Sequence, residues 1–227
     1  MADADSRTGL RYGTPEVTSF VDHLHAAHDP ALDAAFRAAA DHGFPAIQLA
    51  PSEGRLVEML ASMIQARRVV EIGTLTGYSA IRLARGLAPG GLLWTIERDP
   101  AHAAVAKRRI ADAGFADRVE VLEGDAMLEL PPLAELGPFD LVFLDADKGR
   151  YDQYGRWAHA NLREGGVLLA DNAYFFGRLL EDDPDADAMR RFHEEAAERF
   201  RTVCIPTPDG LLLGVKRGAS AAVQSPP

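Results

Sequence analysis

The sequence feature that most constrains the fold is a regular alternation of short apolar runs with helical segments after Arg68. Strands that are buried on both faces read as continuous apolar runs, and strands that alternate with helices form a parallel sheet. The pattern therefore predicts a doubly wound α/β fold. The apolar runs lie at residues 69–73, 92–97, 119–124, 139–145 and 166–171, and the helices between them begin near Tyr78, Pro100, Ala126 and Arg150.

The stretch before this alternation predicts helices and no strand. Thr14-Pro15 and Asp29-Pro30 each place a capping side chain before a proline at the first helical position. Gly43 is a typical residue for the end of the second helix. Helices are accordingly expected over residues 14–28, over 30–43 and from a cap at Ser52, within an N-terminal helical region of residues 14–66.

The end of the chain predicts a different connection. A helix around residues 185–200 precedes two apolar runs, at 201–205 and 211–217. Pro208-Asp209-Gly210 lies between these runs, and such residues favour a tight turn. The sequence thus predicts a closing antiparallel hairpin, which brings a mostly parallel sheet to seven strands.

Composition bounds the class of protein. A chain of 227 residues suits a single domain over 1–227, with polar ends at 1–10 and 218–227 that we expect to be disordered. The net charge of −10 disfavours a nucleic-acid partner. The polar start does not resemble a signal peptide, so we expect none, and no apolar stretch approaches the ~20 residues of a membrane span. We therefore expect no membrane partner. Since Cys204 is the single cysteine and cannot form an internal disulfide, we also expect a cytoplasmic protein.

A glycine-rich turn follows the first strand. In the segment EIGTLTGYS (71–79), Gly73 and Gly77 would let the backbone turn sharply and approach a ligand. The backbone N–H groups at the start of the next helix, near Tyr78 and Ser79, favour an anionic group such as a carboxylate. The spacing differs from the G-x-G-x-x-G of dinucleotide binders. A plain strand-to-helix turn is the alternative.

Polar groups also follow the second and third strands. Glu97 ends the second strand, where an acid can accept hydrogen bonds from both ribose hydroxyls. Asp125 and Ala126 follow the third strand at the same rim and could face an adenine ring. A solvated carboxylate at a strand end is the alternative for Glu97. The ordered set of three strand ends nevertheless favours a nucleoside ligand.

A cluster of acids follows the fourth and fifth strands. Asp145 and Asp147 end the fourth strand, and Asp171 and Asn172 end the fifth. Neighbouring parallel strands lie roughly 5 Å apart, so these tips can converge. Carboxylate and amide oxygens suit Mg²⁺, Ca²⁺ or Mn²⁺, and zinc is disfavoured because no thiolate or histidine is present. Helix N-caps are the alternative for each acid.

Lys148 directly follows this cluster. It is one of three lysines among the 24 basic residues of the chain. One interpretation is an ion pair that neutralises Asp145 or Asp147. The other is a proton acceptor, since lysine can lose its proton in a suitable site and arginine cannot.

Three stretches together resemble a known family. They are VVEIGTLTGYSAIRLA (69–84), FDLVFLDADKGRYDQY (139–154) and GGVLLADNAYFFG (165–177). The chain resembles the caffeoyl-CoA O-methyltransferase family of class I S-adenosylmethionine-dependent enzymes, which includes bacterial catechol-type members. The resemblance runs from about Ile47 to Arg217.

The resemblance implies roles for individual residues. It implies that Asp145, Asp171 and Asn172 ligate a divalent metal, with Asp145 and Lys148 in catalysis and Lys148 in the role of base. It also implies a homodimer. The residues that it places at S-adenosylmethionine are Glu71, Gly73, Gly77, Tyr78, Ser79, Glu97, Asp125, Ala126, Asp145 and Asp147.

The sequence departs from the family pattern in two places. Leu49 and Arg55 stand where the family often has a hydroxyl residue and a glutamine. Tyr174, Phe175 and Phe176 replace the usual Leu-Trp pair after Asn172, and we expect them to form an aromatic wall for a planar substrate.

The resemblance implies methyl transfer from S-adenosylmethionine to a phenolic hydroxyl of a vicinal diphenol, with a divalent ion chelating the two oxygens. Three alternatives remain open. One is a relative that methylates a hydroxyl of a tRNA wobble uridine, which the acidic balance disfavours. The others are a nicotinamide-dependent oxidoreductase and a non-enzymatic partner protein on the same scaffold.

Overall fold

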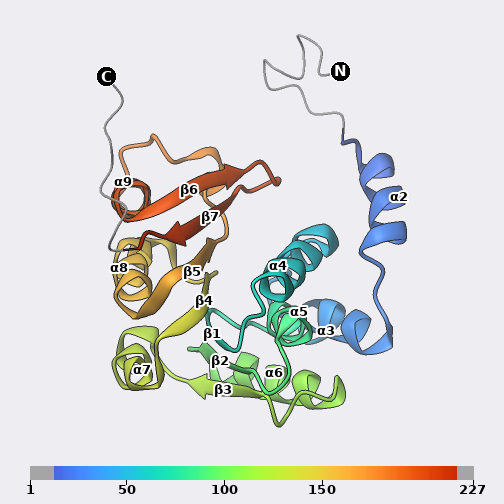
Figure 1. The fold of residues 1–227 in the computed structure, drawn as a ribbon. Helices are drawn as coiled ribbons and strands as arrows, with labels where there is room; N and C mark the ends of the chain where they lie inside the picture. The colour runs from blue at the N-terminus through green and yellow to red at the C-terminus, as the bar shows by residue number, and fades with distance from the viewer. Residues whose placement is uncertain (1–12, 219–227) are drawn as a thin grey trace.

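A computed structural model describes residues 13–218, and the seven strands of this part form one sheet in the order β3-β2-β1-β4-β5-β7-β6 (Figure 1). The first five pair in parallel, and β7 pairs antiparallel with both β5 and β6. The predicted fold class is therefore confirmed. The strands are β1 (Arg68–Ile72), β2 (Leu92–Glu97), β3 (Val119–Glu123), β4 (Phe139–Leu144), β5 (Leu162–Ala170), β6 (Phe200–Ile205) and β7 (Leu211–Lys216).

The strand order reverses beside β1. The chain runs from β1 outward to β2 and β3, and then returns to place β4 on the other side of β1. In register, Glu71 of β1 lies between Thr95 of β2 and Phe143 of β4. Because the connections on the two sides of such a point leave in opposite directions, they open a crevice beyond the carboxyl ends of the strands.

Helices cover both faces of the sheet (Figure 1). Side chains alternate along each strand, so Val70 and Ile72 join one core cluster and Val69 joins the other. The first cluster is completed by α7 (Ala126–Leu133), α8 (Tyr151–Asn161) and α9 (Pro184–Arg199). The second is completed by α3 (Pro30–Asp41), α4 (Pro51–Met63), α5 (Tyr78–Gly86) and α6 (Pro100–Asp112).

The first described helix, α2 (Pro15–His25), differs from the others because it buries no residue. Thr14 caps it as predicted, and Asp29 caps α3 in the same way. The helix stands beside α4 at the edge of the domain (Figure 1). Its exposed apolar side chains recur at helical spacing, at Val17, Phe20, Val21 and Leu24.

The predicted cap of α4 is wrong. The N-cap is Ala50, whose side chain has no acceptor, and Ser52 lies inside the first turn, where its hydroxyl contacts Asp22. Glu53 caps the helix instead, because its Oε2 accepts a hydrogen bond from the Ala50 N–H at 3.0 Å. Pro51 directly after Ala50 fixes the start of the helix.

Several predicted boundaries shift. The fifth strand begins at Leu162, four residues before the predicted start, and the first helix ends at His25. The last parallel crossover begins with a 3₁₀ turn, η2 (Lys148–Arg150), before α8. The predictions for residues 1–10 and 218–227 lie outside the described residues, except at Gly218. No helix between residues 13 and 218 is long and apolar enough to cross a membrane.

Candidate active site

A cavity of about 700 Å³ opens where the carboxyl ends of the parallel strands meet. The turn after β1 forms part of its lining. Gly73 has φ +97°, and a Cβ there would collide with the backbone of Asp145 at the end of β4. Gly77, with φ +90°, is the N-cap of α5. The two glycines therefore allow the turn to pass against β4 and still enter a helix.

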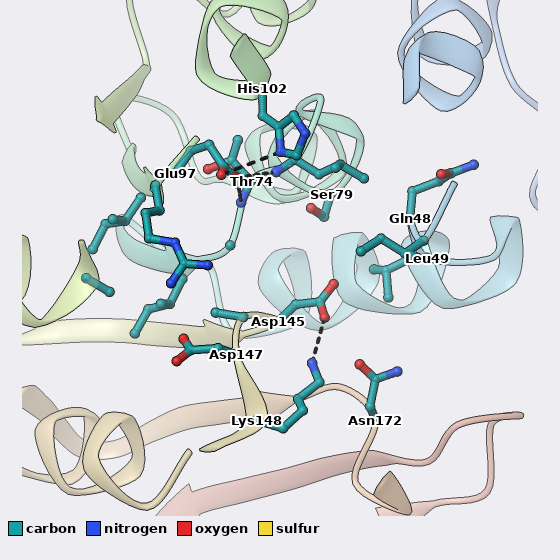
Figure 2. A pocket seen from close by; sticks show the side chains of 18 of the residues that line it. Gln48, Leu49, Thr74, Ser79, Glu97, His102, Asp145, Asp147, Lys148 and Asn172 are labelled. Carbon is teal, nitrogen blue, oxygen red and sulfur yellow. Dashed lines mark hydrogen bonds and ion pairs between the residues drawn. The ribbon is translucent and has the colours of Figure 1, made fainter. Parts of the chain in front are cut away.

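Glu97 is held firmly at the end of β2. Its Oε2 accepts hydrogen bonds from the N–H groups of Thr74 (3.2 Å) and Leu75 (2.8 Å), and its Oε1 accepts one from Asp99 N–H at 2.9 Å. The ring of His102 lies 3.7 Å from the same Oε1, and both side chains border the cavity (Figure 2). These contacts fix the carboxylate where the sequence predicts a ribose contact.

Glu71 is fully buried one strand away from Glu97. Burial raises the pKa of its carboxyl from 4.5 to about 8, and the neighbouring Ser79 and Thr95 hydroxyls oppose that rise. Its Oε2 accepts from the Thr95 hydroxyl at 2.5 Å, while its Oε1 has no hydrogen-bond partner. A buried oxygen without a hydrogen-bond partner is destabilising. This position therefore suits a ligand group that donates a hydrogen bond or carries positive charge.

Ion pairs connect the loops that follow β3 and β4. Asp125 caps α7 through the Met127 N–H at 2.9 Å, and its two oxygens accept from Arg150 at 2.8 and 2.9 Å. Arg150 also lies 3.4 Å from Asp147, which accepts a hydrogen bond from the Tyr154 hydroxyl at 2.6 Å. Asp125, Asp147 and Ala126, which the sequence analysis placed at the cofactor, all line the cavity.

The other end of the cavity gathers the predicted metal ligands. Asp145 and Asn172 face the same space, with Lys148 beside them (Figure 2). Asp171 is buried, and burial followed by the neighbouring Asp145 carboxylate raises the pKa of Asp171. Lys148 Nζ lies 3.2 Å from Asp145 Oδ1. The structure thus brings the four side chains together, as expected from the carboxyl ends of β4 and β5.

This donor set fits a hard divalent cation. The Asp145 carboxylate contributes to the raised pKa of Asp171, and a cation between the two would relieve that repulsion. Within residues 13–218, no three His, Cys, Asp or Glu side chains gather as a metal site. The candidate set instead counts two acids and the Asn172 amide, which leaves coordination positions for other oxygens because Mg²⁺ prefers six.

Two further acids at this end were missed by the sequence analysis. Burial raises the pKa of Glu53, and Asp209 and Asp145 raise it further. Asp209 lines the cavity from the turn between β6 and β7. That turn is joined to the segment after Asn172, because Tyr174 N–H donates to the Asp209 carbonyl at 3.0 Å. Sequence analysis considered Asp209 only as part of a turn, and it did not consider Glu53.

The expected aromatic wall is reduced to one ring. Phe176 lines the cavity and is 58% exposed. Phe175 is buried in the core beneath Arg178, and the Tyr174 ring packs over Gly210. Neither of these two borders the cavity. The strained backbone of this segment, with φ near +50° at Phe175 and Phe176, turns the adjacent rings in different directions.

Other cavity residues were also not predicted. They come from loops and from the first turns of helices, and no single motif marks them. Leu49, which the sequence analysis noted as a departure, is present and offers no hydroxyl. The remaining unpredicted residues include Gln48, Thr74, Thr76, Arg98, His102, Arg150 and Tyr154.

Comparison with known proteins assigns this site to a family. A family model described as O-methyltransferase matches residues 23–217. The chain belongs to the O-methyltransferase family. This confirms the resemblance to the caffeoyl-CoA O-methyltransferase-like group of class I S-adenosylmethionine-dependent O-methyltransferases, and it assigns methyl transfer in preference to nicotinamide-dependent oxidoreduction.

Relatives of this methyltransferase match over most of their length. A catechol O-methyltransferase of Mycobacterium tuberculosis is 47% identical over 175 residues, which are 77% of this chain and 79% of that protein. The structure of TomG from Streptomyces achromogenes, involved in tomaymycin synthesis and solved with SAM, has a TM-score of 0.85 and 37% identity, over 89% of this chain and 96% of that one. An O-methyltransferase from Bacillus cereus, in complex with SAH, has a TM-score of 0.85 and 34% identity, over 89% and 97%.

Proposed function

We propose that this methyltransferase transfers a methyl group from S-adenosylmethionine to a phenolic hydroxyl of a vicinal diphenol, with a divalent cation at Asp145, Asp171 and Asn172. One observation carries the proposal. A single cavity contains both the polar residues that follow β1, β2 and β3 and residues of the acidic end, which follow β4 and β5. Its volume of about 700 Å³ is within the range of small-molecule sites. The catechol O-methyltransferases among its relatives support the substrate class.

The rim supplies the cofactor contacts in this proposal. Glu97, already fixed by three backbone N–H groups, receives the ribose hydroxyls. Glu71 and Ser79 lie at the methionine end, where an ammonium group would satisfy the unpaired Glu71 oxygen. Asp125 and Ala126 face the adenine. S-adenosylmethionine supplies the methyl group that is transferred.

The acidic end orients and deprotonates the phenol. A phenol has a pKa of about 10 and is a poor nucleophile at neutral pH. A divalent ion held by Asp145, Asp171 and Asn172 would lower that pKa and fix the ring through both oxygens. Lys148 Nζ is the group to which we assign the proton, because lysine can accept one and arginine cannot. Phe176 covers the ring from the outer side.

A mass-spectrometric panel tests the proposal. The purified protein, S-adenosylmethionine and Mg²⁺ are mixed with vicinal diphenols and with matched monophenols of the same scaffold. We expect a gain of one methyl group on the diphenols and far slower reaction of the monophenols, which offer one oxygen instead of two. Equal catalytic efficiency for both members of a pair would refute chelation as the source of selectivity.

The remaining expectations stay predictions. For methylation of a tRNA wobble uridine, the runner-up, a filter-binding assay with bulk tRNA is the test, and the net charge of −10 predicts no retention. The expected homodimer is checked by the mass from light scattering at several concentrations. Cytoplasmic location is checked by cell fractionation.

A further inference from the structure

The hydroxyl of Tyr151 lies at a junction that the proposed mechanism does not use. Tyr151 is the first residue of α8, and its side chain is fully buried. Its Oη lies 3.1 Å from the Leu144 carbonyl at the end of β4 and 3.1 Å from the Asp171 carbonyl just beyond β5. Lys148 Nζ lies 2.7 Å from the same Oη, which is the shortest contact that the lysine makes.

The hydrogen count fixes the direction of these bonds. A phenolic hydroxyl has one proton, and both carbonyls can only accept, so that proton is directed to the strand ends. The oxygen lone pairs of Tyr151 are then left for Lys148, which must be the donor. A buried hydroxyl whose donor and acceptor capacities are both used has a defined orientation.

Two anchors therefore hold Lys148. One N–H is directed to Tyr151 Oη and another to Asp145 Oδ1 at 3.2 Å. The lysine side chain is only 12% exposed. Free lysine side chains sample many rotamers, so an amine that is required at one point gains from such fixation. The third bonding position of Nζ is the one that remains for a group in the cavity, which Lys148 lines (Figure 2).

We propose that Tyr151 is a positioning residue, which sets the amine of Lys148 beside the reacting phenol by accepting its hydrogen bond. This inference rests on the proposed function for its catalytic consequence. The structural consequence, that Lys148 is immobilised by Tyr151, stands independently. One experiment tests whether Tyr151 immobilises Lys148, and a second tests whether this matters for catalysis.

The first experiment measures the position of Lys148 without any methyl transfer. Trace acylation of the folded protein is followed by peptide mass spectrometry, and the other two lysines, Lys107 and Lys216, serve as internal standards. Tyr151→Phe removes the acceptor and keeps the ring, so labelling of Lys148 relative to the standards should rise about fivefold or more. The matched control is Tyr154→Phe, which removes a hydroxyl of the same helix that bonds Asp147 and should leave the labelling ratio of Lys148 unchanged.

An unchanged ratio in folded Tyr151→Phe would overturn the proposal. Should that variant fail to fold, nitrogen-15 spectra of the lysine amines in the unaltered protein decide the matter. We expect the Lys148 amine to show slowed proton exchange and a contact with the Tyr151 ring. An amine signal that is averaged like that of the exposed Lys107 would contradict it.

The second experiment is a double-mutant cycle on turnover. Misplacing a catalytic group by about 1 Å can cost up to ~10²-fold. We expect Tyr151→Phe to lower kcat by ~10-fold or more with KM for S-adenosylmethionine changed less than about twofold. In a Lys148→Ala background, the same change should lower kcat no further, because the positioned group is gone. Independent, multiplicative losses would assign Tyr151 a purely structural role, whereas absence of turnover in the unaltered protein would refute the proposed function instead.

Discussion

The two ends of the cavity differ in how their acids are satisfied. At the cofactor rim, Glu97 accepts three backbone N–H groups, Asp125 is paired with Arg150, and Asp147 accepts from Tyr154. At the acidic end, the carboxylates face one another, and the described part of the chain shows one ion pair among them, between Lys148 and Asp145. Repulsion accordingly contributes to the raised pKa of Asp171 at this end.

The difference indicates which kind of ligand each end of the cavity is prepared to bind. A carboxylate that is already held by donors is oriented before a ligand arrives, and binding costs little reorganisation. Carboxylates that repel one another are stabilised by positive charge, so a bound cation would stabilise the acidic end. Changes at the rim should therefore act on cofactor affinity, and changes at the acidic end on the metal requirement and turnover.

Asp171→Ala should have the largest effect. Loss of one of two carboxylates removes much of the attraction for the cation, and metal-assisted activation is worth several kcal/mol, or roughly 10²–10³-fold in turnover. Calorimetry should show nearly unchanged affinity for S-adenosylmethionine. EDTA should abolish turnover of the unaltered protein, and Mg²⁺ should restore it. Full activity in excess chelator, with elemental analysis confirming metal-free protein, would break the comparison.

Lys148→Ala and Lys148→Arg should come next. If Lys148 takes the proton, both variants lose ~10²-fold in turnover, because the guanidinium cannot accept a proton. Cofactor affinity should stay normal in both, since Lys148 belongs to the acidic end. Near-normal turnover of Lys148→Arg would instead make Lys148 an electrostatic residue, with solvent as the proton acceptor.

Glu97→Ala should act on cofactor affinity, because Glu97 belongs to the cofactor rim. The loss of charge-assisted hydrogen bonds should weaken S-adenosylmethionine binding by about 1.5–3 kcal/mol, measured by calorimetry. Melting temperatures must be compared in parallel, because the change also deprives the N–H groups of Thr74, Leu75 and Asp99 of their acceptor. An unchanged dissociation constant in a folded variant would reduce Glu97 to a structural acid.

Glu71 offers the smallest and finest test, because it is the rim acid with an unpaired oxygen. Its folded-state pKa of about 8 lies above the ordinary 4.5, so its contribution to stability is fully present below about pH 4.5 and is lost as the pH rises through 8. Denaturant unfolding without cofactor should show a free energy of unfolding that declines between about pH 4.5 and 8. The slope should correspond to at most about one proton lost per molecule on unfolding. Glu71→Gln should flatten the decline, and equal slopes would mean that Glu71 is ionised in the folded protein.

Much of the site could be predicted because each signal was local. Gly73 and Glu97 stand directly at strand ends, and a strand end in a parallel sheet has a known place in space. The acids of β4 and β5 converge for the same reason. Glu53, Asp209 and Tyr151 escaped prediction because their roles depend on contacts with residues far along the chain.

The succession of strands and helices along the chain, the caps at Thr14 and Asp29, and the glycine turn could be inferred from the sequence alone. These features follow from hydrophobic periodicity and short-range backbone preferences. Tertiary packing, in contrast, determines that Phe176 faces the cavity while its neighbour Phe175 enters the core. It likewise determines that the hairpin turn brings Asp209 to the acidic end. The physical reason is that side-chain direction in a loop is set by what packs against it, and those partners come from other elements of the fold.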